Sequence, residues 1–71
     1  MIANDFFRVI LERVAKAAAL PENRNADGSV NWDFVDADVF METKPTENCV
    51  ELFYTLFERA CDVVETSMET V

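Results

Sequence analysis

Four side chains that carry oxygen donors lie close together in segment 23–31, around the only glycine of the chain. They are Asn23, Asn25, Asp27 and Asn31. Amide and carboxylate oxygens spaced along such a turn are ligands that a hard cation such as calcium prefers. The same residue types also stabilise a plain connection between two helices through Asx-turns. The segment is therefore interpreted as a turn between two helices, with a cation site as the alternative interpretation.

Aligned on Gly28, residues 23–34 resemble the calcium-binding loop of EF-hand and dockerin-type modules. The four oxygen donors then fall at loop positions 1, 3, 5 and 9. The resemblance implies calcium held between two helices, and it covers twelve of the 71 residues. The sequence departs from the family at both ends of the loop. Position 1 is Asn23 rather than aspartate, and position 12 is Phe34, which cannot chelate a cation.

The chain has no histidine, which removes the commonest general base and metal ligand at neutral pH. Cys49 and Cys61 would therefore lack the imidazole that usually activates a cysteine nucleophile. Twelve residues of helix would place them about 18 Å apart, whereas a disulfide spans at most about 7 Å. We predict a protein that is not an enzyme and has no cofactor, with two free, buried thiols. Free thiols favour a cytoplasmic location, in the producing or host cell.

Acidic residues are concentrated in the later part of the chain. Residues 27–71 hold eleven acidic residues against Lys44 and Arg59, whereas residues 1–26 are nearly balanced, and the net charge is −8. Such a surface repels nucleic acid and anionic membranes, so we exclude both as partners. It can serve solubility alone, or it can meet a basic protein. The predicted acidic face consists of Asp33, Asp36, Asp38, Glu51, Glu58, Asp62 and Glu65.

The clearest element is a long helix over residues 46–68. A polar, mostly acidic stripe recurs every three or four residues, as a helix requires: Glu51, Thr55, Glu58, Asp62, Glu65 and Glu69. The residues off this stripe are mostly apolar and span far more than the arc of about 100° typical of a one-sided helix. We therefore predict that a homodimer covers part of this apolar face. The face comprises Leu52, Phe53, Leu56, Phe57, Ala60, Val63 and Val64.

Two further helices are expected. One runs over about residues 4–20, with Asn4 as its N-cap and Pro21 directly after its end. The other covers residues 31–42, where a strand with a bulge is the alternative. Its density of acidic residues and the lack of a second strand in the chain favour the helix. We expect one all-α domain over residues 1–71, a small bundle of three helical segments.

Together these features predict a non-enzymatic acidic module for protein–protein interaction, acting as an adaptor or inhibitor. In size and charge it resembles accessory proteins of phages and mobile elements, some of which mimic nucleic acid with an acidic face. The alternative function is a degenerate helix–loop–helix protein that binds a metal ion or small ligand through residues 23–31.

Overall fold

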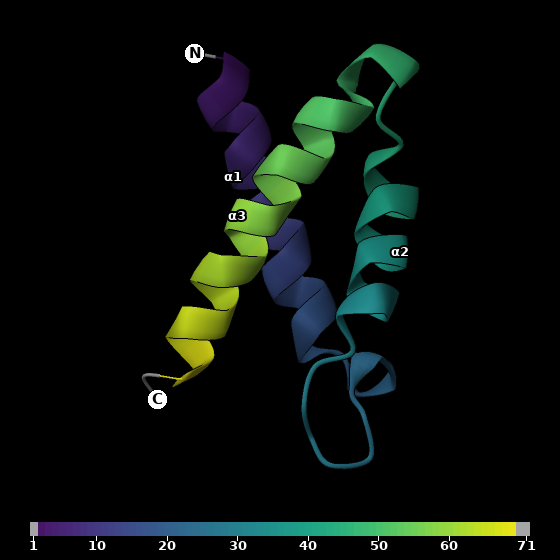
Figure 1. Cartoon of the computed structure of the whole chain (residues 1–71), viewed down its shortest axis with the longest axis vertical. Helices are drawn as coiled ribbons and strands as arrows, with labels where there is room; N and C mark the ends of the chain where they lie inside the picture. The colour runs from purple at the N-terminus through teal and green to yellow at the C-terminus, as the bar shows by residue number, and fades with distance from the viewer. Residues whose placement is uncertain (1, 70–71) are drawn as a thin grey trace.

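The computed structural model describes residues 2–69 and shows an all-α fold, as the sequence predicts. Of its three α-helices, the first and the third cross in an open X, and the second lies to one side of them (Figure 1). The helices are α1 (Ile2–Ala19), α2 (Trp32–Thr43) and α3 (Val50–Glu69), and two short 3-10 helices, η1 (Pro21–Asn23) and η2 (Glu47–Cys49), connect them. None of the helices in the described residues is long and apolar enough to cross a membrane.

Helix α1 is the element against which both other helices pack. It begins at Ile2, two residues before the predicted start at Asn4, and it ends just before Pro21, whose ring disfavours a helical residue ahead of it. Ile10 and Val14 are completely buried, and the small Ala17 and Ala18 continue the same buried face. Each large apolar side chain buried in this way contributes on the order of 1.5–3 kcal/mol to folding.

Helix α2 confirms the prediction that favoured a helix over a strand for residues 31–42. The Asn31 side chain accepts a hydrogen bond from the Phe34 N–H at 3.3 Å, which caps the first turn. Lys44 ends the helix in the left-handed conformation (φ 49°), and its N–H donates to the Phe40 carbonyl. Only Val35 and Val39 of this helix are fully buried, and both belong to the common core.

Helix α3 begins at Val50, after the 3-10 turn, rather than at residue 46. Most of its predicted apolar face is buried within a single chain, namely Phe53, Leu56, Phe57, Ala60 and Val64. Leu52 and Val63 remain 44% and 45% exposed. The side chain of Glu69, the last residue of the predicted acidic stripe, lies outside the described part of the structure.

An aromatic cluster joins α2 to α3 near the turn that connects them. The Phe40 ring meets the Phe53 ring edge-on, with centroids 5.6 Å apart, and stacks on Tyr54 at 6.0 Å. Phe53 also stacks on Phe57 at 5.8 Å. Such aromatic pairs add about 0.5–1.5 kcal/mol each beyond the area that they bury. The two helices are therefore held together at this end, and they separate toward the other (Figure 1).

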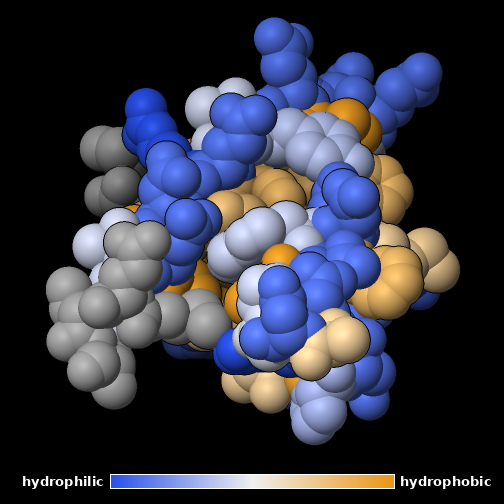
Figure 2. Space-filling view, turned by 60° about the horizontal axis from the view of Figure 1, so that its bottom comes forward, coloured by the Kyte–Doolittle hydropathy of each residue, from blue (hydrophilic) through white to orange (hydrophobic). Residues whose placement is uncertain are grey.

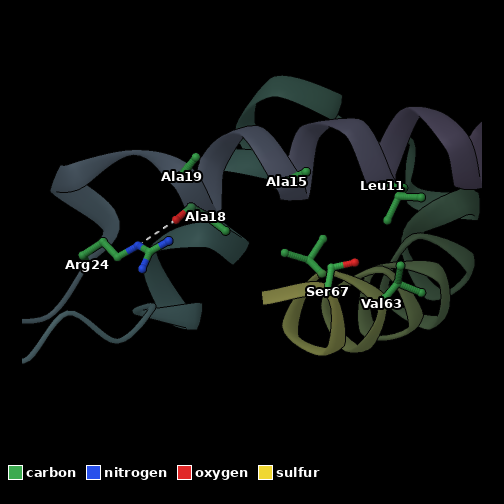
Figure 3. A pocket seen from close by; sticks show the side chains of 8 residues that line it. Leu11, Ala15, Ala18, Ala19, Arg24, Val63 and Ser67 are labelled. Atoms are coloured by element: carbon green, nitrogen blue, oxygen red, sulfur yellow. Dashed lines mark hydrogen bonds between the residues drawn. The ribbon is translucent and has the colours of Figure 1, made fainter. Parts of the chain in front are cut away.

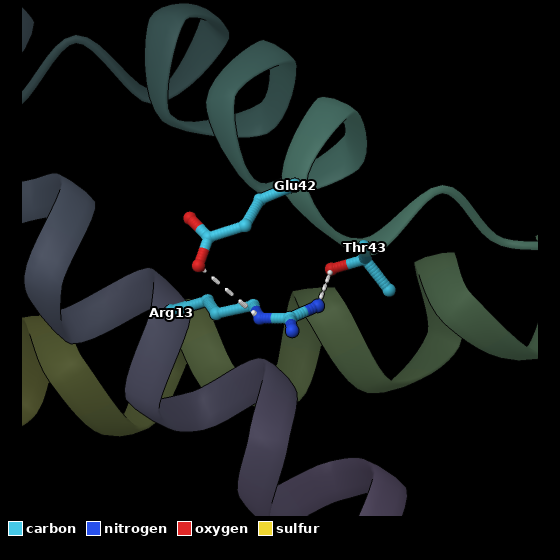
Figure 4. A network of polar contacts seen from close by, with 3 residues as sticks. All are labelled: Arg13, Glu42 and Thr43. Atoms are coloured by element: carbon cyan, nitrogen blue, oxygen red, sulfur yellow. Dashed lines mark hydrogen bonds and ion pairs between the residues drawn. The ribbon is translucent and has the colours of Figure 1, made fainter.

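A polar contact fixes the end of α2 onto α1 (Figure 4). The Arg13 guanidinium lies 3.4 Å from the Glu42 carboxylate and donates a 2.9 Å hydrogen bond to the Thr43 hydroxyl. Both partners of the ion pair are partly exposed, so the pair contributes at most about 1 kcal/mol. Its main effect is to set the position of the α2 end.

Candidate functional site

The loop between α1 and α2 is a compact turn built around Arg24. The backbones of Arg24 and Val30 pair in a short antiparallel bridge. The Arg24 side chain donates from Nε to the Ala18 carbonyl at 3.0 Å and from its guanidinium end to the Gly28 carbonyl at 2.9 Å. Gly28 has φ +90°, a conformation that disfavours any residue with a Cβ atom. The single glycine is thus explained by the turn itself.

The four predicted cation ligands are directed to different places. The buried Asn23 amide donates to the Ala17 carbonyl at 3.0 Å and to the Asp38 carboxylate at 2.7 Å. Asn31 caps α2. Asn25 and Asp27 meet at Ser29, whose hydroxyl accepts from the Asn25 amide and donates to Asp27.

At most two of these four side chains, those of Asn25 and Asp27, therefore share a hydrogen-bond partner, which is Ser29. The two hydrogen bonds from Ser29 also hold the pKa of Asp27 below its ordinary value. Within the described residues, no group of three or more carboxylate or cysteine side chains is placed to hold a metal ion. The hydrogen bonds of Asn25 and Asp27 to Ser29 close the turn between α1 and α2.

The predicted acidic face is divided between two sides of α2. Successive helical residues are about 100° apart, so Asp36 and Asp38 point roughly 200° apart. Asp38 turns toward Asn23 and the end of α1. Asp36 turns toward α3, where its charge acts on Tyr54 and Cys61. The structure thus groups Asp36 and the nearby Asp33 with the α3 carboxylates, and it separates Asp38 from them.

A cleft of about 370 Å³ lies between the start of α2 and the second half of α3. Its lining combines apolar and acidic side chains, namely Trp32, Phe57, Glu58, Cys61, Asp62 and Glu65. Figure 2 shows the end of the molecule where the helices separate, with hydrophilic residues bordering a hollow of weakly polar and apolar ones. Three of the seven predicted acidic residues line this cleft, whereas Glu51 lies nearer the start of α3, outside the lining.

The cleft has a strongly negative electrostatic environment. Burial first, and then the charges of Asp36, Asp62, Glu65 and Glu58, together raise the pKa of the Cys61 thiol to about 12. Burial also raises the pKa of Asp36, while the nearby Tyr54 hydroxyl lowers it by hydrogen bonding. The Asp36 Oδ1 atom is buried without a hydrogen-bond partner. A thiol with so high a pKa stays protonated at neutral pH and is a poor nucleophile.

A second groove, of about 460 Å³, separates α1 from the other side of α3 (Figure 3). It is lined mainly by small or branched apolar side chains, with Arg24 at one end: Leu11, Ala15, Ala18, Ala19, Arg24, Val63, Val64 and Ser67. Helix α3 is therefore flanked by two different surfaces, an acidic cleft toward α2 and an apolar groove toward α1.

Sequence reasoning identified the α3 carboxylates but did not group them with the two aromatic side chains that line the cleft, Trp32 and Phe57. The available signal was the spacing of Trp32, Asp36 and Phe40, which recur every four residues and so share one face of a helix. Both cysteines are free, as predicted from their separation, but the prediction that they are buried was wrong, since each is only partly buried. No known protein family, characterised protein or solved structure matches this chain.

Proposed function

We propose that this protein is a non-enzymatic interaction module that binds a basic protein through its α2–α3 acidic surface. We define this surface as Asp33, Asp36, Glu58, Asp62 and Glu65. One observation supports it above the others: in the described residues the only ion pair is that between Arg13 and Glu42, so these carboxylates carry charge that the fold does not neutralise. A basic partner would relieve their mutual repulsion and would be attracted over a distance of about 10 Å or more.

The binding would take the form of an adaptor or an inhibitor. A partner whose basic surface normally holds nucleic acid would be blocked by an acidic protein in the same place, which is the inhibitor form of the proposal. The two free cysteines support a reducing compartment, the cytoplasm, as the place of encounter.

Affinity capture from a cell lysate at low and high salt tests this function. The acidic surface is altered by Glu58→Gln, Asp62→Asn and Glu65→Gln together. The matched control carries Asp5→Asn, Glu12→Gln and Glu22→Gln, which remove the same charge from exposed positions in α1 and η1. We expect basic proteins to be captured at low salt, to be released at high salt, and to be lost with the first variant only.

Identified partners are then purified and titrated against both variants. Equal binding by the two variants would show that net charge alone, rather than the α2–α3 acidic surface, causes capture. Competition between this protein and DNA for the purified partner separates an inhibitor that mimics nucleic acid from an adaptor that leaves the partner's nucleic-acid surface free.

We also propose that the chain forms a homodimer through the α1–α3 groove. Val63 is 45% exposed beside it, and the alanines of α1 leave room for the close approach of another helix. Val63→Asp should convert the dimer to a monomer in sedimentation equilibrium at micromolar protein. Met41→Asp is the control, because Met41 is exposed on α2 and does not line the groove. A native protein that is monomeric at every concentration would refute the dimer.

A further inference from the structure

The Trp32 side chain is placed where it can contact a ligand in the α2–α3 cleft. It packs partly against the core and also lines the cleft opposite the Cys61 and Phe57 side chains of α3. The aromatic contacts of Phe40 with Phe53 and Tyr54 join α2 to α3 at the other end of α2, so the two helices are held together there. The open end thus presents an aromatic ring at a concave site, rather than on a flat surface.

The rim of the cleft carries charge of one sign. Glu58, Asp62 and Glu65 follow one another at spacings of four and three residues, so they lie along one side of the cleft about 5–6 Å apart. Asp36 and Asp33 add negative charge from the α2 side. No carboxylate in the cleft forms an ion pair within the described residues. Aromatic side chains that line the cleft, together with carboxylates along its edge, favour binding of a cationic group that is carried on an apolar side chain.

We infer that the cleft receives an arginine side chain of the basic partner, with its guanidinium group against Trp32 and its charge facing Asp62 and Glu65. Arginine fits better than lysine for two reasons. Its planar group stacks on aromatic rings, and its fork of N–H donors can bond to two carboxylates at once. A volume of about 370 Å³ is at the small end for ligand pockets, which suits one side chain. This inference rests on the proposed function and supplies the anchor for it.

The test uses the fact that Trp32 is the only tryptophan of the chain, so its fluorescence reports on the cleft directly. The native protein is titrated with a hexa-arginine peptide and, separately, with a hexa-lysine peptide at the same ionic strength. We expect a saturable change of Trp32 emission with hexa-arginine, and an affinity several-fold higher than for hexa-lysine. Asp62→Asn with Glu65→Gln should weaken hexa-arginine binding, whereas the control Glu12→Gln with Glu22→Gln should weaken it less.

A second variant removes the aromatic ring and keeps apolar volume. Trp32→Leu should lower the affinity for a fluorescently labelled hexa-arginine peptide about 2- to 30-fold, measured by anisotropy. Circular dichroism checks that this variant folds. The carboxylate variants leave the core intact and test the same cleft if the Trp32→Leu variant does not fold.

The results separate this inference from the proposed function. Hexa-arginine binding that leaves Trp32 emission unchanged, or that both peptides share equally, would overturn the arginine site, even where basic proteins are still captured through the acidic surface. Failure of both peptides to bind, together with failure to capture any basic protein, would overturn the proposed function as well.

Discussion

The Asn23 side chain donates a 2.7 Å hydrogen bond to the Asp38 carboxylate, fifteen residues later in the chain. The same amide group donates to the Ala17 carbonyl near the end of α1. Asn23 therefore connects the end of one helix to the side of another, and it gives the Ala17 carbonyl a second donor beside the Leu20 N–H. A residue that the sequence suggested as a cation ligand is thus placed to hold α2 against α1.

Replacing this residue should destabilise the fold. Asn23→Ala removes two hydrogen bonds, one to the Ala17 carbonyl in a buried setting and one to the charged Asp38 carboxylate, at a combined cost of roughly 1–3 kcal/mol. For a chain of this size, each kcal/mol corresponds to about 4–8 °C in the melting temperature. Urea unfolding followed by circular dichroism measures the change. Asn25→Ala, which alters an exposed amide of the same loop, is the control and should stay within about 0.5 kcal/mol. Equal losses in the two variants would contradict the bridging role.

The loop over residues 23–31 is expected to be indifferent to calcium. Each of its four oxygen-bearing side chains already makes a hydrogen bond within the protein, and Asp27 is the only carboxylate among them. Calcium would have to draw these side chains away from their present partners, and a single carboxylate brings little charge to replace its water. Calorimetric titration of chelator-treated protein with millimolar calcium should give no saturable heat and no rise in melting temperature. A saturable heat that Asp27→Asn abolishes would establish the site.

Ionisation of Asp36 should make the fold less stable. Burial raises its pKa above the ordinary value of 3.8, so the folded state binds the proton more tightly than the unfolded state does. Stability is therefore lost as the pH rises from the unfolded pKa through the folded one. At pH 7 the Asp36→Asn variant should have a higher melting temperature than the native protein. Below about pH 3 the two proteins should melt at the same temperature, because residue 36 is then uncharged in both. Thermal unfolding across this pH range measures the difference. Asp62→Asn, at an exposed position, is the control, and a native protein more stable than Asp36→Asn at pH 7 would disprove the effect.

The Cys61 thiol should react slowly in the folded protein. With a pKa of about 12 instead of 9.0, only a very small fraction is thiolate at pH 9. In a Cys49→Ser variant, we expect the reaction of Cys61 with a disulfide reagent at pH 9 to be roughly 100-fold or more slower than in urea. Neutralising Glu58, Asp62 and Glu65 should accelerate it in the folded state, because their charges oppose ionisation. Equal acceleration by neutralising Asp5, Glu12 and Glu22 would point to net charge instead.

The sequence predicted α3 more firmly than α2 for a physical reason. Along α3 the carboxylates keep to one stripe, so the helical period is visible without any structure. Along α2 apolar side chains occur on all sides: Val35 and Val39 are buried, whereas Phe34 and Met41 are 53% and 67% exposed. No single period dominates such a segment. The segment is a helix because it packs against α1 and because Asn31 caps its first turn. The packing is a contact between distant parts of the chain, so the local sequence pattern does not reveal it.

The negative charge of the candidate site was predictable from the sequence, but which carboxylates share the site was not. Composition indicated an acidic surface, and the helical period of α3 indicated that its carboxylates lie on one face of the helix. The three aspartates of α2 look alike in the sequence, yet Asp36 faces α3 and Asp38 faces Asn23. Only the positions of α1 and α3 around α2 decide which of them share a surface. For the same reason the sequence overstated the apolar area available to a second copy, because α1 and α2 together already bury five of the seven residues named for it.

The turn around Gly28 has a practical consequence for engineering the protein. Residues 25–29 are exposed, and a Cβ atom built on Gly28 would meet nothing within 4 Å. The Arg24–Val30 bridge holds the two sides of the turn together at its base, next to the helices. Exposed turns of this kind tolerate added sequence better than any other part of a small domain. An epitope or fluorophore-binding peptide inserted there would extend away from the bundle, and would label the protein while both surfaces of α3 stay accessible.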